Sequence, residues 1–411
     1  MKKKRLYIFN GSSRAAEYGI GTYVNQLIRV LKDSDWEFHV VYLYAQGKEV
    51  EIVEKDGYTQ IAIPFPYAQV KNANQYYARN IAYLLKELIP ENKEMKTVFH
   101  LNFMTNDVLV KSLKKHFHYK IILVAHYTNW SFSLFGDHTQ LKTLLEKTKL
   151  KDVREKTIVK EFKEDVRMIN KVDQFVCVAQ HTYTIFQKLG GVQATKTEII
   201  NNALADDYNP LSNQEKCLLR KKYAIEENTK VIIFAGRLDD VKGLGDLITA
   251  FKKLLTLYPN TRLIIVGEGN FNAWLKEASD SWSKITFTGR IDKKKLYEFY
   301  SLADIGVTCS LHEEFGFVAI EMMMHELPLI VTKTSGLNEI VEDKISGLKV
   351  PVRTLKGKRQ VDVKSLTEKM AFLLENPASA KELGENGRKR FLEKYHLSLF
   401  KEKMINLYNH I

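Results

Sequence analysis

Short apolar segments of strand character alternate with helical patterns along most of the chain, and the alternation runs twice. The first series of β-branched and aromatic runs comprises RLYIFN, EFHVVYLY, IAIPFP, TVFHLN, KIILVAHY and DQFVCVA. The second series comprises KVIIFAG, TRLIIVGEG, ITFTGR, DIGVTCS, LPLIVT and GLKV. Alternation of this kind predicts an α/β fold built on doubly wound, largely parallel sheets.

The polar, turn-rich stretch NNALADDYNPLSNQEK, residues 201–216, separates the two series and predicts a linker. A chain of 411 residues is long enough for two domains, each with its own core. We predict one domain over residues 1–205 and a second over 206–385. The remaining helices, 386–411, exceed what the second sheet needs for cover, so we expect them to pack back on the first domain.

Composition places the chain among globular proteins, with 45% hydrophobic and 27% charged residues. No stretch has the roughly 18 to 20 uncharged apolar residues of a membrane-spanning helix, and the start MKKKRLYIFNGSS has no cleavage site. Cys177, Cys217 and Cys309 are far apart, and two of them lie in apolar runs, which is typical of buried hydrophobic residues in a reducing compartment. These features predict a cytoplasmic protein.

The formal net charge of +13 raises the question of a polyanionic partner, either nucleic acid or an anionic membrane. Most basic residues are interspersed with acids. The densest basic run, VKSLKKHFHYK at residues 110–120, has two interpretations, a solvated helix face or a peripheral contact with lipid headgroups.

The segment FAGRLDDVKGLGDLITAF follows the first strand of the second series. Loops after strands are where doubly wound sheets bind their ligands. Arg237 and Lys242 place two cations on this loop, beside the free amides of a helix start, and such a loop suits a diphosphate. The alternative is a pair of surface cations neutralised by Asp239 and Asp240.

The segment SLHEEFGFVAIEMMM leads from another strand into a helix that we expect to begin near Phe315. Gly316 lets a ligand approach the backbone amides of the helix start. Glu313 lies in the preceding loop, and Glu321 lies eight positions further on, rotated by roughly 80° on a continuous helix. The two carboxylates are therefore expected to serve different parts of one ligand, although Glu321 could also simply complement the helix dipole.

In the first series, Gly19 and Gly21 stand where a strand and loop lead into a helix. This G-x-G lacks the third glycine and the downstream acid of a dinucleotide fingerprint, but it allows a phosphate to approach the helix start. His126 ends a strand and suits contact with a substrate hydroxyl or a structural hydrogen bond. HExxH, CxxC and Walker A patterns are absent, so we predict no metal and no cofactor.

Two wound domains in series, with G-R-x-x-x-x-K-G after one strand and E-x-F-G-x-x-x-x-E later, resemble a GT-B glycosyltransferase of the large retaining family 4. The resemblance covers nearly the whole chain and is strongest over residues 230–350. It implies two Rossmann-like domains facing each other across a cleft, with 1–205 on the acceptor side and 206–385 binding a nucleotide sugar.

The resemblance also implies residue roles. Arg237 and Lys242 would hold the diphosphate and stabilise the leaving group, Glu313 would contact the donor sugar, and His126 would face the reacting sugar. The implied donor-binding residues are Gly19, Gly21, Arg290, Ile291, Phe315, Gly316, Phe317 and Glu321. Among these, Arg290 and Ile291 would cradle the base, Glu321 would bind the ribose, and Gly19 would offer an amide to the phosphate.

The implied activity is transfer of a sugar from a UDP- or GDP-sugar to an acceptor hydroxyl, with retention of configuration and without a metal. The acceptor classes left open are a saccharide, a lipid-linked glycan and a peptide. One alternative is a nucleotide-sugar epimerase or hydrolase of the same fold. The other is a non-catalytic polyanion-binding protein, which would leave Arg237, Lys242, Glu313 and Glu321 unexplained, so we expect no nucleic acid partner.

Overall fold

The structure is a computed structural model, and it describes residues 4–11, 18–65, 72–90, 92, 94–102, 107–355 and 358–411. It divides into two compact units: unit 1 consists of Met1–Asn202 and Leu397–Ile411, and unit 2 of Ala203–His396. Within the described ranges, no helix is long and apolar enough to cross a membrane.

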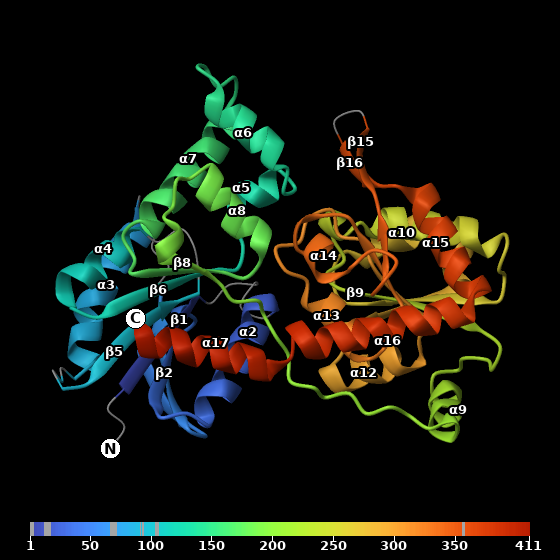
Figure 1. Cartoon of the computed structure of the whole chain (residues 1–411), viewed down its shortest axis with the longest axis horizontal. Coiled ribbons are helices and arrows are strands. Elements are labelled where there is room, and N and C mark those ends of the chain that lie inside the picture. The colour runs from blue at the N-terminus through green and yellow to red at the C-terminus, as the bar shows by residue number, and fades with distance from the viewer. Residues whose placement is uncertain are drawn as a thin grey trace. The chain divides into compact units, whose positions relative to one another are not determined.

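Unit 1 is built on an eight-stranded sheet with the order β3-β4-β2-β1-β5-β6-β7-β8 (Figure 1). Neighbouring strands are parallel, except that β3 pairs antiparallel with β4. The strands are β1 Lys4–Gly11, β2 Trp36–Ala45, β3 Glu51–Lys55, β4 Tyr58–Pro64, β5 Lys96–Leu101, β6 Lys120–Ala125, β7 Gln174–Cys177 and β8 Thr197–Ile199.

The helices of unit 1 cover this sheet with apolar faces. In α2, for example, Tyr23, Leu27 and Val30 recur at helical spacing and are all buried. The helices are α2 Gly19–Lys32, α3 Ala73–Leu88, α4 Asp107–His116, α5 Asn129–Ser133, α6 His138–Glu146, α7 Val153–Ile169, α8 Gln180–Lys188, η1 Ala194–Lys196 and α17 Leu397–His410.

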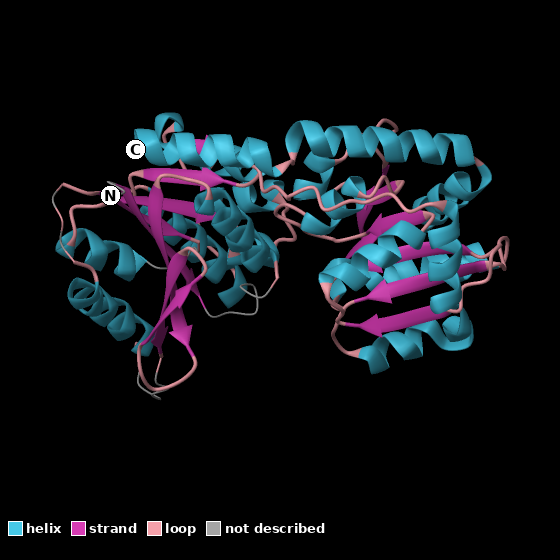
Figure 2. Ribbon diagram, turned by 90° about the horizontal axis from the view of Figure 1, so that it is seen from below, coloured by secondary structure: helices cyan, strands magenta, loops and turns pink. Residues whose placement is uncertain are grey.

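Unit 2 is built on a six-stranded, wholly parallel sheet with the order β11-β10-β9-β12-β13-β14. Its strands are β9 Lys230–Ala235, β10 Thr261–Val266, β11 Ile285–Gly289, β12 Ile305–Thr308, β13 Leu329–Thr332 and β14 Leu348–Val350, with an antiparallel pair β15 Val352–Leu355 and β16 Lys358–Val361. Figure 2 shows helices on both faces of this sheet.

The helices of unit 2 follow the alternation expected from the sequence. They are α9 Asn213–Lys222, η2 Asp240–Lys242, α10 Leu244–Leu255, α11 Phe271–Ala278, η3 Ser279–Lys284, α12 Lys293–Leu302, α13 Phe317–Met324, α14 Ser335–Ile340, α15 Val363–Glu375 and α16 Pro377–Lys394.

Two expectations from the sequence concern single positions of unit 2. Cys309 is buried and forms no disulfide, and the same holds for Cys177 in unit 1. The α13 helix begins at Phe317 and not at Phe315, because Gly316 adopts a left-handed conformation (φ 118°) that ends the preceding loop.

The C-terminal tail is divided between the units. The last helix, α17, belongs to unit 1, where Phe400 packs against Tyr23 and Tyr408 against Trp36. The preceding α16 belongs to unit 2, although the sequence predicts that the returning segment starts at residue 386. Its Arg390 donates hydrogen bonds to backbone oxygens of residues 339 and 340, and these contacts hold α16 within unit 2.

Both sheets contain the doubly wound strand order 3-2-1-4-5-6. In unit 2, β9 is the central first strand, and β12 lies on its other side from β10. In unit 1, β1 is the central strand between β2 and β5. The strand order reverses at β9/β12 and at β1/β5, and ligands of such sheets bind beyond the carboxyl ends of the strands at this switch point.

Candidate functional site

The loops that follow β9 and β12 meet directly at the switch point of unit 2. The amide of Leu311 donates to the carbonyl of Val241 over 2.7 Å, and the Cys309 thiol donates to the carbonyl of Lys242 over 3.3 Å. A Cβ at Gly243 would lie only 2.1 Å from the carbonyl oxygen of Cys309. This close packing fixes the backbone of Lys242 against the loop that carries Glu313.

Lys242 and Glu313 form a two-oxygen ion pair across these loops. Nζ of Lys242 lies 2.8 and 2.7 Å from the two carboxylate oxygens of Glu313. The side chains are only 17% and 18% exposed, so water screens this pair less than a surface pair. The sequence singled out both residues, but it did not predict that they bind each other.

The other predicted cations also have acidic partners. Arg237 lies 3.0 Å from Asp239, as the surface-pair interpretation expects, and Arg290 lies 3.9 Å from Glu268. Asp239 additionally caps η2 by accepting from the Lys242 amide over 3.2 Å. The positive charges at this edge are therefore balanced by acids, and an anionic ligand must replace part of these contacts.

The start of α13 lies next to this pair in the sequence and has no side-chain cap. Uncapped first-turn amides and the positive end of the helix dipole favour an anionic or oxygen-rich ligand. Gly316 is required here for packing as well as conformation, since a Cβ would lie 2.8 Å from Leu337.

Glu321 lies within α13 and is 6% exposed. Burial raises the pKa of its carboxyl, while Lys293, at 3.3 Å, and the Tyr300 hydroxyl, at 3.4 Å, act in the opposite direction. Glu313 and Glu321 thus have different protein partners, Lys242 and Lys293.

Three strand ends at this edge are in backbone contact. A Cβ at Gly267, after β10, would lie 1.8 Å from the carbonyl oxygen of Gly236, after β9. The Gly267 amide in turn donates to the carbonyl of Gly289 over 3.0 Å. These glycines bring the strand ends close together beside Arg237 and Arg290.

In unit 1, Gly19 is the first residue of α2, and Gly21 follows within its first turn. The helix start has neither a side-chain cap nor an acidic residue in its first turn. Its amides therefore remain suited to an anion. The loop 12–17 that leads into this helix lies outside the described residues.

His126 directly follows β6, next to the switch point of unit 1, and it belongs to a buried group of polar side chains. Its Nε2 lies 3.0 Å from Oδ1 of Asn102, which is also 3.0 Å from Nε2 of His100. The hydroxyl of Tyr408 lies 2.8 Å from Nδ1 of His100, and the ring edge of Tyr23 packs on His126. We call these five residues the polar network.

The sequence analysis did not identify Asn102, His100, Tyr23 and Tyr408. One available signal was the run TVFHLN, in which His100 and Asn102 stand two positions apart within an apolar strand and so face the same side of the sheet. Polar residues at such buried positions need partners.

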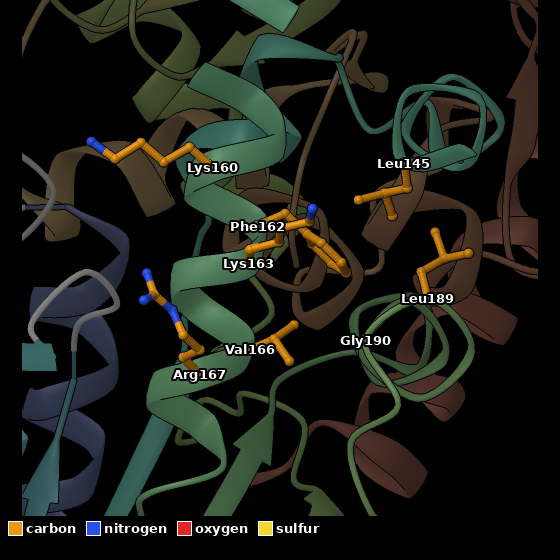
Figure 3. Close-up of a pocket in the computed structure, with 8 residues that line it drawn as sticks. All are labelled: Leu145, Lys160, Phe162, Lys163, Val166, Arg167, Leu189 and Gly190. Atoms are coloured by element: carbon orange, nitrogen blue, oxygen red, sulfur yellow. The ribbon is translucent and has the colours of Figure 1, made fainter. Parts of the chain in front are cut away.

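Two further features bear on ligands. Among the described residues, no three His, Cys, Asp or Glu side chains are grouped to hold a metal ion. A cavity of about 560 Å³ lies in unit 1 between α6, α7 and the segment after α8, and its lining includes Leu145, Phe162 and Leu189 (Figure 3). It contains none of the predicted site residues, so we do not assign it to this site.

Comparison with known proteins agrees with this architecture. The family model described as "Glycosyl transferases group 1" matches residues 215–390, and that described as "Glycosyltransferase Family 4" matches residues 18–208. An uncharacterised glycosyltransferase of Methanocaldococcus jannaschii is 33% identical over 159 residues, which cover 37% of this chain and 40% of the relative.

A second relative is a GDP-mannose-dependent monoacylated alpha-(1-6)-phosphatidylinositol monomannoside mannosyltransferase of Corynebacterium glutamicum. It is 25% identical over 254 residues, which cover 60% of this chain and 64% of the relative. The chain therefore matches less than two thirds of the length of these relatives.

Among solved structures, sucrose-phosphate synthase from Thermosynechococcus elongatus has a TM-score of 0.79 at 19% identity, covering 99% of this chain and 98% of that one. This likeness, with two Rossmann-like units in series, defines a protein of the GT-B fold class. The two family models together span both units, and the chain belongs to the family 4 glycosyltransferases.

Proposed function

We propose that this chain is a retaining glycosyltransferase that moves a sugar from a nucleoside diphosphate sugar to an acceptor hydroxyl. The observation that carries the proposal is the Lys242–Glu313 pair at the switch point of unit 2, in a chain of this family. Lys242 supplies a cation for a phosphate, and Glu313 supplies a carboxylate for sugar hydroxyls. The two residues lie on two loops that are in contact.

The ion pair suggests how the donor is bound. The diphosphate takes the place of Glu313 as the partner of Lys242, and the released Glu313 carboxylate accepts hydrogen bonds from hydroxyls of the donor sugar. Glu321, buried nearby along α13, accepts from the ribose hydroxyls in the same way. Arg290 and Ile291, after β11, contact the base.

The chemistry follows from where charge develops. The bond between the anomeric carbon and the diphosphate oxygen breaks, leaving negative charge on the diphosphate and positive charge on the sugar ring. Lys242, Arg237 and the uncapped amides of α13 stabilise the leaving group. The acceptor oxygen bonds to the anomeric carbon on the same face, and its proton passes to the departing phosphate oxygen.

We further propose that transfer needs no metal ion, because two cationic side chains and helix amides are available to neutralise the leaving group. The chelator EDTA tests this directly. Full activity in EDTA is expected, and loss of activity that added Mg²⁺ or Mn²⁺ restores would refute this part of the proposal.

The donor base, UDP or GDP, and the acceptor, whether saccharide, lipid-linked glycan or peptide, are open within this proposal. We also propose a cytoplasmic enzyme whose basic run 110–120 contacts an anionic membrane. Lys111 and Lys114 of this run are 59% and 39% exposed, although Asp107 and Asp173 pair with them. Cosedimentation with anionic but not neutral vesicles tests this contact.

A thermal-shift panel of nucleoside diphosphates and their sugars, in EDTA, tests the central proposal. We expect stabilisation by one nucleotide series, and transfer activity with the corresponding sugar donor. Lys242→Ala should slow transfer by about 10- to 100-fold, since a hydrogen bond to a charged group contributes about 1.5–3 kcal/mol.

Lys222→Ala is the matched control, because Lys222 pairs with Glu298 in the same unit, and the two residues lie on helices α9 and α12 and not on the loops after β9 and β12. Full turnover by Lys242→Ala, or a shift with none of the nucleotides, would contradict the proposal.

A further inference from the structure

The polar network of unit 1 connects His126 to the C-terminal helix through buried groups. His100, Asn102 and Tyr408 are each 0% exposed, and Tyr23 is 2% exposed. Oδ1 of Asn102 lies 3.0 Å from a ring nitrogen of each histidine, and the Tyr408 hydroxyl closes the far side of His100 at 2.8 Å. His126 is the member nearest the surface.

With the Asn102 carboxamide oriented as in the structure, its hydrogen bonds set the positions of the histidine protons. A carboxamide oxygen can only accept, so the Nε2 atoms of His100 and His126 that face it each carry a hydrogen. Nδ1 of His100 then accepts from the Tyr408 hydroxyl. His126 keeps a lone pair on Nδ1, and that atom has no hydrogen bond to a described residue.

The electrostatic environment keeps both rings neutral. Burial, together with the neighbouring His100, lowers the pKa of His126 to about 3, and burial lowers the pKa of His100 to about 4. The other titratable groups that face the two rings are the hydroxyls of Tyr23 and Tyr408, and burial raises the pKa of each. Each histidine therefore carries one hydrogen at neutral pH, as the hydrogen bonds require.

We propose that Asn102 is a positioning residue for His126. It occupies the Nε2–H, so that His126 presents Nδ1 to its ligand as a hydrogen-bond acceptor, and Tyr408 of the C-terminal helix maintains the arrangement through His100. The ligand group that fits is a hydroxyl, which has a hydrogen to donate, and not a carbonyl, ether or phosphate oxygen. Only the identification of this hydroxyl as part of a sugar rests on the proposed function.

The competing arrangement exchanges oxygen and nitrogen in the Asn102 carboxamide. Nδ2 would then donate to both rings, and both histidines would carry their hydrogen on Nδ1. In the orientation described here, Nδ2 of Asn102 is buried without a partner among the described residues. Buried polar groups in native proteins are rarely left so, and a ligand oxygen or a water commonly completes such a donor.

Nitrogen NMR of the full chain, labelled with ¹⁵N-histidine, distinguishes the two arrangements without any substrate. Loss of signals in His126→Gln and His100→Gln assigns the resonances. We expect His126 to be protonated at Nε2 and unprotonated at Nδ1 at neutral pH. Protonation at Nδ1 would overturn the proposal.

Variants of Asn102 test whether this residue sets the protonation state of His126. Asn102→Asp keeps both acceptor contacts and adds a negative charge, so the pKa of His126 should rise by about 1–3 units. Asn102→Leu removes the acceptor, so His126 should become a mixture of tautomers. Unchanged His126 signals and pKa in both folded variants would also overturn the proposal.

Tyr408→Phe and Tyr77→Phe form a matched pair of hydroxyl deletions in unit 1. The Tyr77 hydroxyl donates to the Ile63 carbonyl and accepts from the Tyr44 amide, outside the polar network. Tyr408→Phe should shift the ring nitrogens of His100, and Tyr77→Phe should not. If both variants changed the His100 signals equally, the change would reflect a general loss of packing in unit 1, and this would count against a role for Tyr408.

Kinetics then relate the network to function. In a working assay, Asn102→Leu should lower kcat about tenfold with little change in the KM of the nucleotide sugar. Asn102→Asp should shift the acid limb of the pH–rate profile to higher pH, because it raises the pKa of His126. An unchanged kcat and pH profile would limit Asn102 to a structural role. If the expected tautomer is found but no nucleotide sugar is transferred, the proposed function fails while this inference stands.

Discussion

Replacing Glu313 with glutamine separates the two roles proposed for the Lys242–Glu313 pair. The variant keeps the size of the side chain but removes the negative charge that neutralises Lys242. A nucleoside diphosphate without its sugar needs only the cation, whereas transfer needs the carboxylate as well. We therefore expect Glu313→Gln to bind the free diphosphate more tightly and to transfer sugar more slowly.

The geometry of the pair gives the magnitude. When the diphosphate has taken the place of Glu313 on Lys242, the displaced carboxylate stays on the neighbouring loop. Because the Glu313 oxygens start 2.7 and 2.8 Å from Nζ and a phosphate oxygen binds the same nitrogen at about 2.8 Å, we take the two negative charges to be about 5 Å apart. Two negative charges at this distance repel by about 0.8 kcal/mol in water and about 3 kcal/mol at a dielectric constant of about 20. The expected gain is about 1–3 kcal/mol, or about 5- to 150-fold in Kd.

Isothermal titration calorimetry with nucleoside diphosphates in EDTA measures this change, and added salt should narrow the difference between the proteins. Glu298→Gln is the control, since Glu298 pairs with Lys222 at 2.8 Å in the same unit. Unchanged or weaker binding by Glu313→Gln, with native melting behaviour, would refute the idea that Lys242 meets the diphosphate.

Three further predictions concern other groups in the two units. Lys293→Met should raise the pKa of Glu321 further, because Lys293 opposes the increase that burial causes. As the pH is lowered, the variant should therefore lose nucleotide affinity, measured as Kd, at a higher pH than the wild type. An unchanged midpoint of this loss would contradict the prediction. Burial raises the pKa of Asp165 to about 7. The protein therefore has the full stability that goes with a neutral Asp165 below about pH 4, and it loses this stability as the pH rises through about 7. Urea denaturation should therefore show that the stability of Asp165→Asn relative to the wild type rises by about 4 kcal/mol between about pH 4 and about pH 8, and a difference that does not change with pH would refute this. Gly267→Ala should destabilise unit 2 by about 3 kcal/mol or more, because the new Cβ would lie 1.8 Å from a carbonyl oxygen. In the control Gly289→Ala the Cβ meets open space, so the loss should be about 1–2 kcal/mol, from the backbone conformation alone. Thermal melts measure both losses, and equal losses would contradict the predicted clash.

Most of the fold could be predicted because buried parallel strands leave a strong local signal. The apolar runs quoted from the sequence correspond to β1, β2, β4 to β7 and β9 to β14. The strands that were missed are the antiparallel pair β15 and β16, together with β3, which is exposed on both faces, and β8, which has three residues. These four strands are short or exposed and depend on their pairing partners, β4 for β3, β7 for β8, and each other for β15 and β16.

The candidate site was predictable only one loop at a time. Glycines and charges after strands identify Lys242 and Glu313 separately, but their pairing depends on the strand order that places β9 beside β12. The polar network is harder still, since His100 and Tyr408 are 308 positions apart. The surplus of helix in the tail predicts that the last helix returns to unit 1, but it does not predict the position along that helix that sets Tyr408 against His100.

The two units share a strand order but differ in the chemistry at their switch points. In unit 2 the groups beyond the strands are charged and paired, as in Lys242–Glu313, and charge pairs can exchange partners with an anionic ligand. In unit 1 the groups beyond the strands are neutral carboxamide, imidazole and phenol groups that are buried away from water. A neutral, buried network would gain little from a phosphate, but it can select a hydroxyl by the direction of its hydrogen bond. The two proposals follow this contrast: the paired charges of unit 2 suit the diphosphate, and the neutral network of unit 1 suits a hydroxyl.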